Sequence, residues 1–86
     1  MTTNMNTLNA INRRANAMTD DDFDALNAKI SALPDDVFDT VNELDGEYTY
    51  NYKLTSAEER AIRAEMDRLL KPYGLKSMDW FVWDCL

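Results

Sequence analysis

Apolar residues recur every three or four positions in four separate segments of this chain of 86 residues. That period places them on one side of an α-helix. A chain this short buries only about 60% of its unfolded surface, so each apolar side has to contribute to one thin core. We therefore predict a single domain over residues 1–86, with helices at residues 4–18, 20–33, 34–44 and 55–71.

Turn and capping residues mark the ends of the second and third helices. Thr19 or Asp20 is expected to cap the second helix, because a short polar side chain can accept a backbone N–H there. Pro34 separates it from the third helix, at whose first turn the missing N–H costs nothing. Gly46 is expected to end the third helix, because glycine readily takes the left-handed conformation.

The sequence favours the first helix less strongly than the fourth. Five asparagines interrupt the first helix, and asparagine is a mediocre helix former, so residues 1–18 are expected to be marginal without packing or a partner. The fourth helix has overlapping capping boxes at its start, Thr55–Glu58 and Ser56–Glu59. Its outer side is expected to carry two ion pairs at four-residue spacing, Glu59–Arg63 and Asp67–Lys71.

Two segments near the C-terminus have the signals of β-strands. In residues 47–54, polar residues alternate with Tyr48, Tyr50, Tyr52 and Leu54. Residues 78–86 are aromatic and β-branched, and we interpret them as a second strand; a short helix capped by Ser77 is the alternative. The predicted fold class is therefore α+β and mostly helical: three N-terminal helices, then strand, helix and strand, with a small two-stranded sheet.

The net charge of −7 is concentrated in the middle of the chain. Residues 1–19 carry +2, residues 20–47 carry −9 and residues 48–86 balance at 0. Such asymmetry concerns the partners that a surface attracts rather than the fold. Helix starts favour anions and explain about half of the ten acids in residues 20–47. Simple solubility and a specific anionic surface both remain open for the others.

Composition argues against several classes of protein. The chain has no histidine, the commonest general base and metal ligand, and its one cysteine, Cys85, cannot form an internal disulfide. The aspartates of residues 20–24 resemble the start of a calcium loop, but Ala25 and Ser31 stand where that loop needs glycine and glutamate. We expect no enzymatic activity, no metal and no cofactor. No apolar run approaches the roughly 18 residues of a membrane span, so a cytoplasmic protein is expected.

The acidic middle of the chain leads to the main functional hypothesis. We expect a small non-catalytic inhibitor that occupies a basic groove meant for DNA or RNA in a protein partner, without binding nucleic acid itself. In size, acidity and lack of catalytic residues the chain resembles phage-encoded proteins that block restriction or CRISPR complexes, which implies a location in the host cytoplasm. A homodimer would raise the charge density further. The residues expected to bind the partner are Asp21, Asp22, Asp24, Asp35, Asp36, Asp39, Glu43, Asp45 and Glu47.

The aromatic residues lead to a second hypothesis of a different class. The protein would be a regulatory or assembly subunit, such as an adaptor or an antitoxin-like partner, because aromatic rings dominate the energetics of interfaces. A core made of these same rings is the competing interpretation. A transcription modulator that uses the acidic surface on RNA polymerase or a repressor is a third hypothesis. The aromatic interface candidates are Tyr48, Tyr50, Trp80, Phe81 and Trp83.

Overall fold

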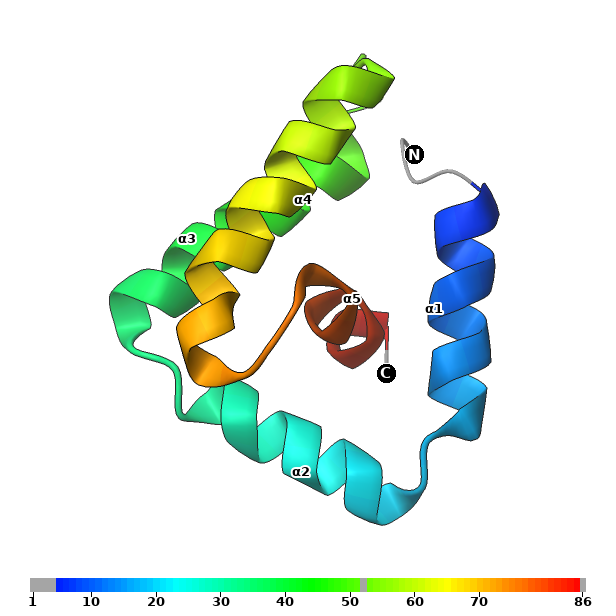
Figure 1. The fold of residues 1–86 in the computed structure, drawn as a ribbon, viewed down its shortest axis with the longest axis vertical. Coiled ribbons are helices and arrows are strands. Elements are labelled where there is room, and N and C mark those ends of the chain that lie inside the picture. Colours follow the sequence, from blue (N-terminus) through cyan, green and yellow to red (C-terminus); the bar gives the residue numbers. More distant parts are fainter. Residues whose placement is uncertain (1–4, 52, 86) are drawn as a thin grey trace.

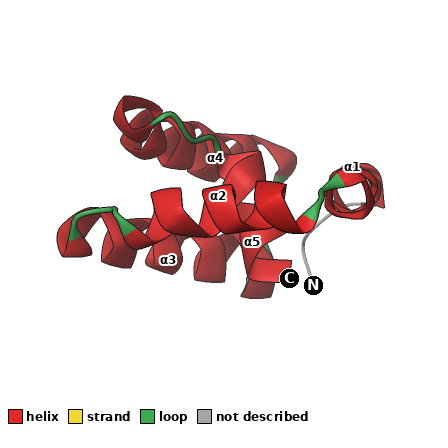
Figure 2. Ribbon diagram, turned by 90° about the horizontal axis from the view of Figure 1, so that it is seen from below, coloured by secondary structure: helices red, strands yellow, loops and turns green. Residues whose placement is uncertain are grey.

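The computed structural model describes residues 5–51 and 53–85, and these residues form five α-helices and one short 3-10 helix. No β-strand occurs in this part of the chain (Figure 2), so the predicted α+β class with its two-stranded sheet is wrong and the fold is all-helical. The elements are α1 (Met5–Ala17), α2 (Asp20–Ser31), α3 (Asp35–Tyr50), α4 (Ser56–Leu70), η1 (Lys71–Tyr73) and α5 (Ser77–Cys85).

The short helix α5 lies in the middle of the molecule (Figure 1). It packs against α1, α2 and α4, while α3 and α4 form an antiparallel pair at one side of it. The molecule is thin, with extents of 36 × 29 × 17 Å. Every long helix therefore turns its apolar side toward one small core. That core consists of Ile11, Leu26, Ile30, Leu33, Val41, Tyr48, Met66, Leu70, Leu75, Trp80, Phe81 and Val82.

The first predicted strand is the C-terminal part of α3 and the loop that follows it. Gly46 does not end the helix; the glycine that takes the left-handed conformation is Gly74, with φ 72°. The helix continues because Tyr48 is buried on the same inner side as Val41. A strand would place Tyr48 and Tyr50 on one side, whereas here Tyr48 is 2% exposed and Tyr50 is 80% exposed. Tyr52 lies outside the described residues.

The second predicted strand is helix α5, so the alternative of a short helix is confirmed. Three consecutive residues, Trp80, Phe81 and Val82, are buried because α5 is surrounded by other helices. Consecutive burial hides the helical period, which is why the sequence resembles a strand. Asp79 and Asp67 complete the start of this helix: their carboxylates accept the backbone N–H groups of Lys76 and Ser77, both at 2.7 Å.

The predicted cap Thr19 of α2 and the predicted capping box Thr55–Glu58 of α4 are confirmed. The second predicted box, Ser56–Glu59, is wrong because Ser56 is already the first residue of α4, and the predicted ion pairs of α4 are also wrong. Thr19 forms a capping box with Asp22, and Thr55 forms one with Glu58. In the described residues, neither Glu59–Arg63 nor Asp67–Lys71 is an ion pair. Asp67 instead caps α5, the Arg63 guanidinium lies 5.7 Å from the centre of the Phe81 ring, and the ion pair on α4 joins Glu65 to Arg68.

Candidate interaction surface

The outer side of α3 carries five exposed carboxylates, and the helix contains no basic residue. Four of them follow one another at four-residue steps, which places neighbours about 5–6 Å apart on one side of a helix. Asp36 belongs to the same side because it precedes Glu43 by seven residues, close to two helical turns. We call this set the acidic face; its members are Asp35, Asp36, Asp39, Glu43 and Glu47.

Helix stability explains only the beginning of the acidic face. Asp35 and Asp36 lie in the first turn of α3, where the helix dipole stabilises a negative charge. Glu43 lies in the middle of α3, beyond the reach of its first turn. Glu47 lies in the last turn, where the same dipole disfavours negative charge, and no basic residue is present there. The second half of the acidic face therefore has no explanation in the stability of α3 itself.

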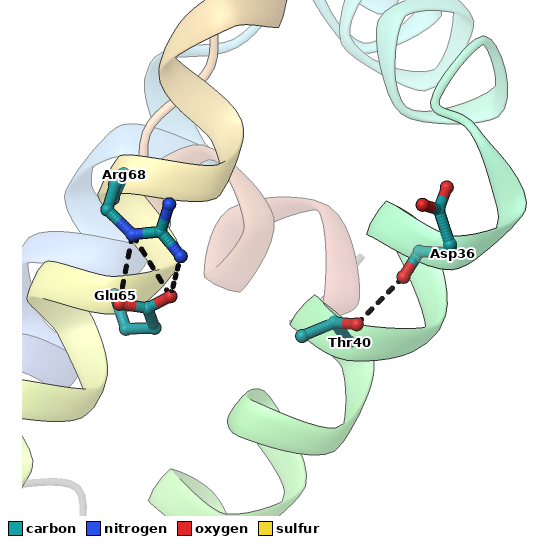
Figure 3. A network of polar contacts seen from close by, with 4 residues as sticks. All are labelled: Asp36, Thr40, Glu65 and Arg68. Atoms are coloured by element: carbon teal, nitrogen blue, oxygen red, sulfur yellow. Dashed lines mark hydrogen bonds and ion pairs between the residues drawn. The ribbon is translucent and has the colours of Figure 1, made fainter.

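The charged side chains of α3 and α4, the two helices of the antiparallel pair, differ in whether they form ion pairs (Figure 3). On α4, Arg68 donates hydrogen bonds to the Glu65 carboxylate, which lowers the pKa of that carboxyl. On α3, the Thr40 hydroxyl donates a hydrogen bond to the backbone carbonyl of Asp36 at 2.8 Å. The Asp36 carboxylate points away from this contact. Among the described residues, no ion pair reaches α3. Its negative charge is therefore presented to solvent without a neutralising partner.

An exposed aromatic ring stands at the end of the acidic face. Tyr50 is 80% exposed and lies three residues after Glu47, so the two side chains are neighbours on the outer side of α3. Among the described residues it is the most exposed large apolar side chain, followed by Tyr73. The outer side of α3 thus combines a row of negative charges with one accessible ring.

The acids of α2 that were predicted to bind a partner have different environments in the structure. Asp21 and Asp24 are exposed. Asp22 accepts the backbone N–H of Thr19 at 3.0 Å and lines a cleft of about 320 Å³ between α1, α2 and the start of α5. Side chains of both signs line this cleft, so it has no clear preference for a charged ligand: Arg14, Asp22, Lys29 and Asp79. The Arg14 and Asp79 side chains form an ion pair with each other.

Asp45 differs from the other predicted acids because it is buried, with 6% of its surface exposed. Burial is the largest cause that raises the pKa of this carboxyl to about 6, and the charge of Asp84 adds to it. The nearby Trp80 indole, and the Thr49 hydroxyl that donates to the Asp45 carboxylate at 3.3 Å, lower this pKa in turn. Asp45 therefore contributes nothing to the exposed acidic face. Asp45 lies four residues after Val41 and so shares its inner side, but this spacing counts only if the helix continues beyond Gly46, which the sequence did not predict.

Most of the predicted aromatic anchors belong to the core. Trp80 and Phe81 are 1% and 3% exposed, and Tyr48 stacks against Phe81 with ring centres 5.0 Å apart. Trp83 is half-buried, and its indole N–H donates to the Asn27 side chain at 3.0 Å. Of the five predicted rings, Tyr50 alone is freely exposed.

Across residues 5–51 and 53–85, no group of three or more histidine, cysteine or acidic side chains is placed to hold a metal ion. In the same residues, no helix combines the length and the apolar composition that crossing a bilayer requires. Comparison with protein families, with characterised proteins and with solved structures found no match to this chain.

Proposed function

We propose that this chain is a small acidic binding protein that inhibits a nucleic-acid-handling partner by covering the partner's basic groove with the acidic face of α3. The observation that carries this proposal is the face itself: five exposed carboxylates on one side of a helix that has no basic residue. A solubilising helix ordinarily mixes both signs of charge. The neighbouring α4 does so.

The charge spacing of the acidic face favours an imitation of one phosphate strand. From Asp35 to Glu47 the helix rises roughly 20 Å, which gives about one negative charge per 4 Å. Duplex DNA carries one charge per about 3.4 Å along each strand and one per about 1.7 Å for both strands. The acidic face therefore comes close to a single backbone and has about half the charge density of a duplex. A groove that follows one nucleic-acid strand is the partner surface that fits best.

Tyr50 adds a second feature to this surface. Proteins that bind single strands combine a basic groove with aromatic platforms on which bases stack. The Tyr50 ring, exposed beside Glu47, stands next to the charges as a base stands next to its phosphates. A basic groove would also attract the acidic face over a distance, so association should be fast at low salt and slower at high salt.

The alternative of a subunit that binds through an aromatic C-terminal end has no support from the position of its rings. Trp80 and Phe81 are core residues, and their burial leaves no surface for a partner to contact. Removal of residues 80–86 is expected to unfold the domain rather than to abolish binding selectively.

A displacement experiment with two matched variants tests the proposed function. The amide variant, Asp35→Asn, Asp39→Asn and Glu43→Gln, removes three charges from the acidic face. The lysine control, Ala57→Lys, Ala61→Lys and Ala64→Lys, adds three positive charges at exposed positions of α4 instead. Both variants change the net charge of −7 by +3, so they share one net charge while the acidic face is altered in only one of them.

The purified chains are added to lysate proteins that have been loaded on single-stranded DNA-cellulose at low salt. The wild-type chain and the lysine control are expected to release the same discrete DNA-binding protein. The amide variant should need a concentration at least about tenfold higher, because it lacks the charges that compete with phosphate. Release of no protein, or equal loss of activity in both variants, would contradict the proposed function.

A further inference from the structure

A cleft of about 280 Å³ is lined by the start of α4 together with one residue each of α1 and α3. We call it the arginine cleft; its lining residues are Thr7, Tyr48, Ser56, Glu59, Arg60 and Arg63. The residues from α1 and α3 are both buried, so part of its wall belongs to the packed interior. Its volume lies at the small end of the range for ligand sites, which suits a compact ligand.

The arginine cleft differs from three other clefts of the molecule in the sign of its charge. Two arginines and one glutamate line it. The clefts of about 320 and 580 Å³ beside Gly74 and Leu75 are each lined by two cations and two carboxylates. A further cleft of about 280 Å³, beside Phe23, is lined by one aspartate and no cation. Because 16 acids outnumber 9 bases in the chain, an excess of positive charge in a cleft runs against the composition.

The position of one arginine is fixed by the core. Arg63 is half-buried, and its guanidinium carbon lies 5.7 Å from the centre of the Phe81 ring. Contact with a ring face holds a guanidinium in place and leaves the N–H groups at its edge able to donate elsewhere. Among residues 5–51 and 53–85, no carboxylate forms an ion pair with Arg63 or with Arg60. The two guanidinium groups therefore keep donors for an anion from outside the chain.

The spacing along α4 brings a third donor to the same side of the helix. Arg60 precedes Arg63 by three residues, and Ser56 precedes Arg60 by four, so all three are neighbours on one side. Two like charges this close disfavour a helix, so the stability of α4 does not explain the arginine pair. The Thr55 hydroxyl accepts the backbone N–H of Glu58 at 3.1 Å rather than that of Ser56. The first turn of α4 thus adds a hydroxyl and a favourable dipole to the two guanidinium groups.

We propose that the arginine cleft binds a single phosphate group, either free phosphate or the monoester of a small molecule, between the guanidinium groups of Arg60 and Arg63. A planar guanidinium donates two parallel N–H bonds to two oxygens of such a group, and the double negative charge of a phosphate balances both arginines. The Ser56 hydroxyl donates to a third oxygen. Glu59 lines the same cleft and repels a second phosphate, so the site selects one phosphate group over a longer polyanion. This site is separate from the acidic face and goes beyond the proposed function.

An NMR titration of the full chain with inorganic phosphate tests the site, at constant ionic strength and about pH 7.5, where phosphate is mostly doubly charged. Saturable shifts are expected at the Nε–H signals of Arg60 and Arg63 and at the backbone N–H of Ser56. The cleft variant, Arg60→Gln with Arg63→Gln, should bind phosphate at least about tenfold more weakly, because it loses two charged donors. The matched control, Arg13→Gln with Arg68→Gln, removes two exposed arginines outside the cleft and should bind within about twofold of wild type. Both variants have the same net charge.

Arg63 packs on Phe81, so a variant at the exposed Arg60 alone keeps the test independent of folding. Arg60→Gln should weaken phosphate binding by about fivefold or more, since one of the two charged donors is lost. A parallel titration with glycerol phosphate separates the two sources of the phosphate group. Tighter binding of the ester supports a phosphorylated small molecule as ligand, and tighter binding of inorganic phosphate supports the free ion. Shifts that do not saturate with either compound, or equal affinity of the cleft variant and its control, would overturn the proposal.

Discussion

The ring of Tyr48 in α3 stacks on the ring of Phe81 in α5, with centres 5.0 Å apart and planes inclined by 23°. Both residues are buried, so this pair joins the C-terminal part of α3 to the central helix. Aromatic pairs contribute about 0.5–1.5 kcal/mol beyond the burial of their surface. The contact gives a physical reason for α3 to continue beyond Gly46 rather than to end there.

Replacement of Phe81 by alanine should remove this contact and leave a cavity in a thin core. The expected loss is about 3–5 kcal/mol in the free energy of unfolding, measured by urea denaturation. That is a large share of the roughly 4–13 kcal/mol available to a domain of this size. Tyr50→Ala is the control and should change stability by less than about 0.5 kcal/mol, because Tyr50 is exposed. Equal, small effects of the two substitutions would place Phe81 outside the core.

The sequence predicted those parts of the fold in which helical period and capping agree. Residues 20–33 and 55–71 combine an apolar side with a capping box at Thr19 or Thr55, and both are helices close to the expected bounds. The strand predicted for residues 78–86 was wrong for a physical reason. A helix buried on several sides shows no polar side, so its pattern does not differ from that of a buried strand.

The sequence predicted an acidic surface on the third helix, but it did not predict which acids belong to that surface. Residues 35, 39, 43 and 47 lie on one side of any helix, so their shared exposure follows from their spacing. The burial of Asp45 depends on where α5 packs, which is a tertiary relationship that local pattern does not contain. The same holds for Tyr48 and Tyr50, whose alternation predicts one face of a strand although only Tyr48 is buried.

The two glycines are expected to respond to alanine in opposite directions. Gly46 lies inside α3 without positive φ, and an added Cβ would meet no atom within 4 Å. Gly46→Ala should therefore stabilise the domain by about 0.5–1 kcal/mol. Gly74 has φ 72°, a conformation that disfavours any Cβ, so Gly74→Ala should destabilise it by about 1 kcal/mol. Thermal unfolding of both variants checks this, and a destabilising Gly46→Ala would argue for a helix end at that position.

The role of Asp67 can be separated from the ion pair that its sequence position suggests. Asp67 accepts the backbone N–H of the buried Ser77 at 2.7 Å. Asp67→Ala should leave this donor unsatisfied and lower the free energy of unfolding by about 1–2 kcal/mol. Lys71→Ala should change it by only a few tenths of a kcal/mol, because no Asp67–Lys71 pair forms in the described structure. Similar losses of unfolding free energy in both variants, measured by urea denaturation, would indicate that the Asp67–Lys71 ion pair forms after all.

The stability of the domain should depend on pH through Asp45. A group whose pKa is raised on folding stabilises the fold below its unfolded pKa and loses that contribution as pH rises through the folded value. For Asp45 the window runs from 3.8 to about 6. Asp45→Asn cannot lose a proton, so at pH 7 it should be more stable than the wild-type chain by up to about 3 kcal/mol. The difference should shrink toward pH 4, and urea denaturation at the two pH values measures it. A variant less stable than wild type at pH 7 would contradict the burial of a charged Asp45.

The most direct test of the acidic face is the salt dependence of binding to the protein that the wild-type chain releases from DNA-cellulose. Its affinity is measured for the wild-type chain, the amide variant and the lysine control at about 50 and 200 mM salt, a range over which electrostatic binding weakens clearly. Affinity for the wild-type chain and the lysine control should fall steeply with salt, whereas the amide variant should bind weakly and respond little. Equal affinity and equal salt dependence of all three chains would show that the carboxylates of α3 do not form the binding surface.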